Sequence, residues 1–125
     1  MPSLDLASEP AAPSLGLRAL DGWLVGVAEE TAERIRLAAG EAISNAVEHG
    51  SARSVTVRWT PTATGGTLCV SGARALGARQ LETAELPSDR LATGGRGLYI
   101  LTRLVDRLDL YEDILCMTFE PRETR

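Results

Sequence analysis

The stretch of sequence that decides the fold is Glu41-Ala-Ile-Ser-Asn45-Ala-Val-Glu-His49-Gly50. It ends a segment, residues 30–48, whose apolar residues recur with the period of an amphipathic helix, and the glycine at 50 stops that helix. Positions 41, 45 and 49 are four residues apart, so a carboxylate, an amide and an imidazole form one stripe along the helix. Ile43 and Val47 lie on the opposite side, which indicates that one face of the helix is core.

Such a polar stripe has two interpretations. In the first it holds a metal-bound triphosphate: Asn45 binds Mg²⁺ through its carbonyl oxygen, Glu41 acts as a general base and His49 lies near phosphate. In the second it is a solvated helix face. Taken alone, the spacing favours the second interpretation, so the first needs support from another part of the chain.

A glycine-rich motif, Gly94-Gly95-Arg96-Gly97-Leu98, supplies that support. It opens a predicted helix, residues 97–105, directly after a long segment without hydrophobic period. Glycines let backbone N–H groups approach a phosphate closely, and the N-terminus of a helix favours anions. The alternative is a plain loop followed by a helix start.

The remaining patterns place both motifs in one domain, residues 1–125. The sequence predicts a two-layer α/β sandwich, with a mixed, mostly antiparallel sheet on one side and three helices on the other. Strands are expected at residues 3–8, 55–59, 67–71, 107–112 and 114–120, and helices at residues 14–27, 30–48 and 97–105. Ser14 is expected to cap the first helix.

In this order and at this separation, the two motifs resemble the N box and the second glycine box of the histidine-kinase-like ATPase superfamily. The stretches 41–50 and 95–98 are most similar to the anti-sigma factor serine kinases of the stress-response and sporulation type. The resemblance covers nearly the whole chain, from the first strand to the final hairpin. It implies the histidine-kinase-like ATPase fold and a site for ATP and Mg²⁺.

The resemblance also implies roles and partners. Glu41 would take the proton of an acceptor serine, Asn45 would bind Mg²⁺, and His49 with Gly95, Arg96 and Gly97 would hold phosphates, under a lid formed by residues 77–93. The partner would be a sigma factor, or an antagonist protein that is phosphorylated on serine, and homodimers are common in this family. Neither direct nucleic-acid binding nor membrane binding is implied.

The chain departs from the family pattern at the adenine end of the site. The family carries an Asp-x-Gly box after the first hairpin, and its carboxylate accepts a hydrogen bond from the adenine amino group. Here that position falls on Ser71 or Gly72, and no acidic residue occurs between Thr67 and Gln80. Thr118 loosely matches a family threonine near the adenine. A neutral acceptor in place of a charged one predicts about tenfold weaker nucleotide binding.

Two function hypotheses therefore remain, beside a third of a general solute-binding α/β domain. In the first the chain is a working protein-serine kinase and anti-sigma factor. In the second it is a non-catalytic module that keeps the fold and the partner surface but has weakened or lost ATP binding. The intact phosphate motifs favour the first hypothesis, and the missing aspartate favours the second.

The composition bounds these hypotheses. Hydrophobic residues make up 44% of the chain and the net charge is −4, as in a globular protein without a basic stripe for nucleic acid. No apolar stretch reaches the roughly 18 residues of a membrane span, and no signal peptide is visible, so we expect a cytoplasmic location. Cys69 and Cys116 lie inside apolar runs, and we expect two reduced core thiols rather than a disulfide.

Overall fold

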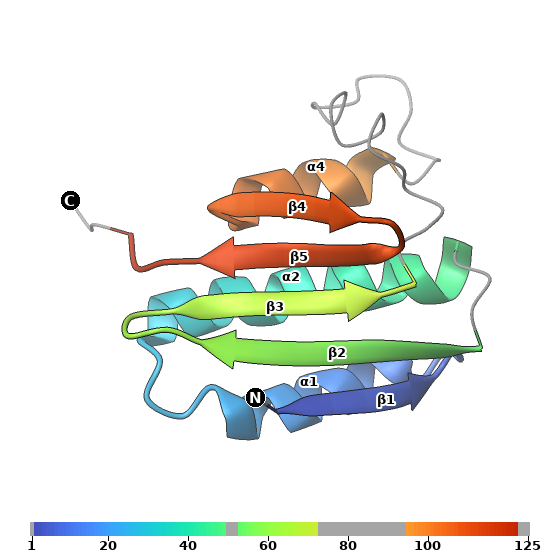
Figure 1. The fold of residues 1–125 in the computed structure, drawn as a ribbon, viewed down its shortest axis with the longest axis horizontal. Coiled ribbons are helices and arrows are strands. Elements are labelled where there is room, and N and C mark those ends of the chain that lie inside the picture. The colour runs from blue at the N-terminus through green and yellow to red at the C-terminus, as the bar shows by residue number, and fades with distance from the viewer. Residues whose placement is uncertain (1, 50–52, 73–94, 123–125) are drawn as a thin grey trace.

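The computed structural model describes residues 2–49, 53–72 and 95–122, with the backbone alone at residues 49 and 95–99. Its strands form one sheet in the order β1-β2-β3-β5-β4. The strands are β1 (Ser3–Ala7), β2 (Ser54–Pro61), β3 (Gly66–Ser71), β4 (Arg107–Tyr111) and β5 (Ile114–Phe119). Helices α1 (Ala12–Trp23), α2 (Glu29–His49) and α4 (Gly95–Leu104) lie together behind the sheet in Figure 1. The predicted two-layer α/β sandwich is confirmed.

Two details of the architecture differ from the sequence-based expectation. All four strand pairings are antiparallel, so the described strands contain no parallel pair of the kind a mixed sheet needs. The reason is that α1 carries the chain back and α2 carries it forward again, so β2 starts where β1 ended. Helix α1 also begins before Ser14, with Ala11 at its N-cap and no side-chain cap, because Pro13 in the first turn has no N–H to leave unpaired.

The sheet has one buried face and one open face. Residues that pair directly across antiparallel strands point to the same side, and alternate residues point to opposite sides. Trp59, Leu68 and Met117 are each at most 1% exposed and pack against the helices. Their neighbours along the strands, which include Arg58, Cys69 and Cys116, point to the other side, which none of the described helices covers (Figure 1).

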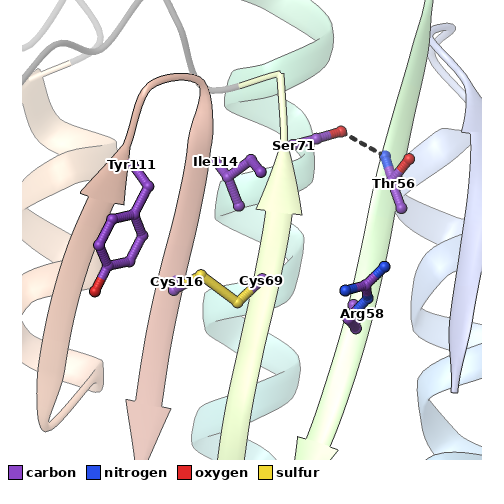
Figure 2. Close-up of a pocket in the computed structure, with 7 residues that line it drawn as sticks. All are labelled: Thr56, Arg58, Cys69, Ser71, Tyr111, Ile114 and Cys116. Atoms are coloured by element: carbon purple, nitrogen blue, oxygen red, sulfur yellow. Dashed lines mark hydrogen bonds between the residues drawn. A yellow bond between two sulfur atoms is a disulfide. The ribbon is translucent and has the colours of Figure 1, made fainter. Parts of the chain in front are cut away.

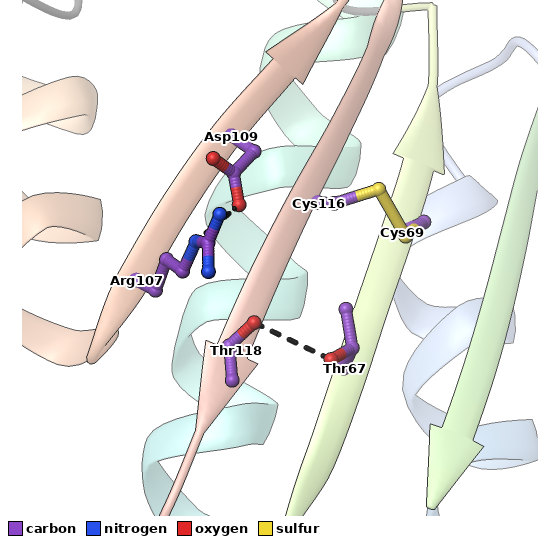
Figure 3. Close-up of a disulfide and its surroundings, with 6 residues drawn as sticks. All are labelled: Thr67, Cys69, Arg107, Asp109, Cys116 and Thr118. Atoms are coloured by element: carbon purple, nitrogen blue, oxygen red, sulfur yellow. Dashed lines mark hydrogen bonds and ion pairs between the residues drawn. A yellow bond between two sulfur atoms is a disulfide. The ribbon is translucent and has the colours of Figure 1, made fainter.

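The two cysteines form a disulfide across the open face, so the expectation of two reduced core thiols is wrong. Cys69 on β3 lies directly opposite Cys116 on β5, as Figure 3 shows. Both residues do sit in apolar runs, but Leu68 and Val70 take the helix-facing positions of β3. The cysteine between them therefore points away from the core, toward its partner on the next strand.

A buried arginine fastens α2 to the ends of α4 and β5. Arg34 is 6% exposed, and its guanidinium donates to the Glu30 carboxylate at 2.7 Å and to the carbonyl oxygens of Leu104 at 2.9 Å and Glu120 at 2.5 Å. It also donates to the carboxylate of Asp106 at 3.3 Å. Four acceptors around one guanidinium satisfy a charge that would otherwise be costly to bury.

Asp106 is held in its ionised form by this cluster. Burial raises the pKa of the Asp106 carboxyl, but the Glu120 N–H at 2.7 Å and the guanidinium groups of Arg122 and Arg34 outweigh that effect and leave the pKa below its ordinary value. A carboxyl with a lowered pKa stabilises the folded state above the pKa of the unfolded chain and loses that contribution as pH falls.

We predict that Asp106→Asn lowers the free energy of unfolding at pH 7, and that the difference from the wild type shrinks as pH falls below the ordinary aspartate pKa of 3.8. Urea unfolding at a series of pH values measures this difference in the free energy of unfolding. The matched control is Asp21→Asn, which removes an exposed ion pair with Arg36 and should change stability by less than about 1 kcal/mol. A difference that stays constant down to pH 2 would contradict the assignment.

Candidate functional site

One side of α2 faces α4, and Glu41 and Asn45 of the polar stripe lie on that side. Arg34, Glu41 and Asn45 are spaced by seven and four residues, which places them within about 40° of one another around a helix of 3.6 residues per turn. Arg34 bonds the carbonyl oxygen of Leu104, the last residue of α4. Glu41 and Asn45 therefore continue along the face of α2 that Arg34 turns toward α4.

The start of α4 lies near the end of α2. Because Arg34, in the first half of α2, meets the last residue of α4, the two helices run in opposite directions along their contact. The ten residues of α4 rise about 14 Å, and the step from Arg34 to Asn45 is about 16 Å. The N-terminal turn of α4, Gly95 to Gly97, consequently lies at the level of Glu41 and Asn45, at the same end of the molecule as the end of β3 (Figure 1).

The end of β3 completes this arrangement. Gly72 follows β3 and is buried against α2, where a Cβ built on it would lie 3.3 Å from the Cβ of Ala46. Its φ of +87° belongs to the left-handed region that favours glycine. The chain thus leaves the sheet beside Ala46, the residue after Asn45, and α2, α4 and β3 converge in this region.

Asn45 is the unusual residue at this point. It is 8% exposed, and its Nδ2 is buried without a hydrogen-bond partner among the residues that the structure describes. A buried amide donor without a partner costs about 1–3 kcal/mol. Buried polar groups in folded proteins are nearly always bonded, so a donor without a partner among the described residues makes Asn45 a candidate ligand-binding residue.

The groups around Asn45 fit a metal-bound phosphate. Its amide offers a donor to a phosphate oxygen or, after rotation by 180°, a carbonyl oxygen to Mg²⁺. The first N–H groups of α4, from Gly95 to Gly97, have no partners within the helix and carry the positive end of its dipole. Glu41 lies half-buried one turn before Asn45, and His49 is the last residue of α2.

The comparison with known families agrees with this geometry. Residues 6–119 match the family model of the histidine kinase-like ATPase domain. The chain belongs to this family. A comparison with curated proteins finds no match. None of the helices in the described part of the chain is long and apolar enough to cross a membrane.

Two predicted site residues of this ATPase domain lie elsewhere. The Oγ of Ser71 accepts a hydrogen bond from the backbone N–H of Thr56 at 2.7 Å, on the open face of the sheet (Figure 2). Thr118 also lies on the open face, where its hydroxyl is 3.3 Å from that of Thr67 (Figure 3). The structure does not bring either hydroxyl to Asn45.

The remaining predicted site features are described in part or lie outside the description. The backbone of Arg96 and Gly97 begins α4 as expected, while the side chains of His49 and Arg96 and the predicted lid, residues 77–93, lie outside the described residues. Sequence reasoning missed Arg34, which orients α4 toward the site. Its signal was the position of this arginine, three residues after Thr31 and four before Ala38, which is the spacing of the buried residues of α2.

We predict that Asn45→Ala raises the free energy of unfolding of the ligand-free domain by about 1 kcal/mol. It removes an unpaired buried donor and introduces the best helix former, and these gains exceed the loss of packing. Urea unfolding measures the change in the free energy of unfolding. Ser44→Ala, on the same turn of the helix, is the matched control for helix propensity. A loss of stability in Asn45→Ala would show that the amide is already satisfied.

Proposed function

We propose that this histidine kinase-like ATPase domain binds Mg-ATP where α2, α4 and the end of β3 converge, and that it is a protein-serine kinase of the anti-sigma factor type. The observation that carries the proposal is the buried Asn45 amide without a partner, on the face of α2 that is turned toward α4. A stripe that served only as a solvated helix face would expose this amide to water.

Each group has a role in the proposal. Asn45 holds Mg²⁺, and the N–H groups at residues 95–97, with His49 and Arg96, hold phosphates. Glu41 takes the proton of the attacking serine hydroxyl as a general base. When bound at Asn45, Mg²⁺ would supply electrostatic stabilisation of the charge that develops on the phosphate oxygens. The resemblance of residues 41–50 and 95–98 to the anti-sigma factor serine kinases supports a sigma factor or its antagonist protein as the partner.

A second candidate function is favoured by the adenine end of the site. Neither Ser71 nor Gly72 offers a side-chain acceptor to the adenine, since the Ser71 hydroxyl lies on the other face and Gly72 has no side chain. An aspartate at this position would be strained, because Gly72 has a φ of +87° and a Cβ would crowd Ala46. A partner-binding module with weak nucleotide affinity is therefore the alternative.

Calorimetric titration with Mg-ATP separates the two functions. Binding by the wild type that is lost in Asn45→Ala supports the kinase, provided that circular dichroism shows the Asn45→Ala protein to be folded. The control is Ser44→Ala, which should bind as the wild type does. Absence of Mg-ATP binding at millimolar nucleotide, or equal binding by Asn45→Ala, overturns the proposal in favour of the partner-binding module.

We predict that Glu41→Gln keeps the affinity for Mg-ATP within about threefold of the wild-type value. The same change should lower the rate of ATP hydrolysis, in which water replaces the acceptor serine, by about 10²-fold or more. The reason is that a general base acts mainly in the transition state. Release of inorganic phosphate measures the hydrolysis, and calorimetry measures the affinity. Glu33→Gln, on the exposed side of α2, is the matched control. Equal hydrolysis by the Glu41→Gln and wild-type proteins would exclude Glu41 as the base.

A further inference from the structure

The open face of the sheet carries a pocket that the nucleotide site does not use. Its volume is about 400 Å³, within the range of small-molecule pockets. Figure 2 shows its lining, which comes from four adjacent strands: Thr56, Arg58, Cys69, Ser71, Tyr111, Ile114 and Cys116. The Cys69–Cys116 disulfide thus lines a space that opens to solvent.

The residues beside the disulfide form one row across the sheet. Arg58 on β2 is directly opposite Cys69, Cys69 is opposite Cys116, and Cys116 is opposite Asp109 on β4. Directly opposite residues have Cβ atoms about 4.5–5.5 Å apart. Each sulfur therefore has a different charged neighbour, Arg58 on one side and Asp109 on the other.

The two charges do not act equally on the sulfurs. Asp109 accepts a hydrogen bond from Arg107 at 2.9 Å, so its charge is largely balanced (Figure 3). Arg58 is exposed and forms no ion pair with another residue in the described part of the chain; Asp5, the carboxylate on the neighbouring strand, accepts a hydrogen bond from Thr56 instead. When the disulfide is reduced, the cation at Arg58 favours the thiolate form of Cys69. The Arg107–Asp109 ion pair does not favour the thiolate form of Cys116 in this way.

We propose that this face is a thiol–disulfide exchange site, in which Cys69 exchanges with low-molecular-weight thiols that carry carboxylates and Cys116 resolves the mixed disulfide. Arg58 selects the class of thiol, because a carboxylate in the pocket lies beside its guanidinium. The site is separate from the proposed nucleotide site, which lies on the helix side of the sheet.

The exchange balances in two steps. The Cys69 thiolate attacks a small-molecule disulfide, which forms a mixed disulfide on Cys69 and releases one small thiolate. The thiolate of Cys116 then attacks the Cys69 sulfur, which forms the Cys69–Cys116 bond and releases the second small thiolate. Two electrons pass from the cysteine pair to the small disulfide, and reduction by two small thiols follows the same path in reverse.

The fold tolerates both states of the pair. Strands β3 and β5 are paired along their whole length, from Gly66–Phe119 to Ser71–Ile114, so the disulfide joins strands that backbone hydrogen bonds already hold together. The side chains next to the cysteines along each strand, such as Leu68 and Met117, remain buried under the helices. Opening the disulfide therefore exposes no core.

Single-cysteine variants test the proposal on the full chain. Cys116→Ser keeps Cys69, and Cys69→Ser keeps Cys116; each is treated with glutathione disulfide at pH 7, and intact-mass spectrometry follows the adduct. We predict that Cys69 reacts about tenfold faster than Cys116, the effect on thiolate population of one adjacent cation. Adding Arg58→Gln to Cys116→Ser should remove this advantage, whereas Arg18→Gln, on α1, should not. Bis(2-hydroxyethyl) disulfide, which is uncharged, should lose only the part of its rate that comes from the thiolate population of Cys69 when Arg58→Gln is added.

Equal rates for the two cysteines, a faster Cys116, or no adduct on either cysteine in the folded chain would overturn the proposal. Circular dichroism establishes that each variant is folded. Should a single-cysteine variant not fold, the wild-type disulfide is treated with reduced glutathione, quenched with acid and mapped by peptide mass. An adduct on Cys69 then supports the proposal, and an adduct on Cys116 or none overturns it.

Discussion

The buried guanidinium of Arg34 is the interaction on which the arrangement of the helix layer depends. It reaches from α2 to the last carbonyl of α4 and to the carbonyl of Glu120, just past β5, and it shares Asp106 with the N–H of Glu120. A buried guanidinium is stable only while all its acceptors are present. The contact between α2 and α4 therefore has one geometry rather than a range of geometries. Because α4 is short and fixed at its C-terminal end, its N-terminal end is directed to the level of Asn45.

The periodicities in the sequence predicted most of the fold, because they record burial directly. The stripe of α2, the hairpins and the start of the last helix all follow from apolar spacing and glycines. The spacing did not determine on which face of the sheet a residue near the end of a strand lies. Ser71 and Gly72 are neighbours, yet one lies on the open face and the other against α2, so a shift of one residue decides whether a side chain reaches the site.

The same limit explains the cysteines and the candidate site. Cys69 lies between two buried residues of its strand, and an apolar run of this kind is compatible with either face until the pairing partner is known. The four-residue spacing of Glu41 and Asn45 predicted a shared face, but not that this face would be the one turned toward α4. That depends on Arg34 and Leu104, which are far apart in the sequence, and no local pattern records such a pairing.

The two ends of the candidate site follow different physical rules. Its phosphate end is built on α2 and α4, whose relative position is fixed, and it offers an amide without a partner and free N–H groups of a helix start. Its base end is a glycine in a conformation that disfavours a side chain. Backbone N–H groups and a metal ligand recognise the charge of a triphosphate, which all nucleoside triphosphates share. The chain has no lysine, so in the proposed site this charge would be met by backbone, arginine and Mg²⁺, and the affinity would come from the phosphates rather than from the base.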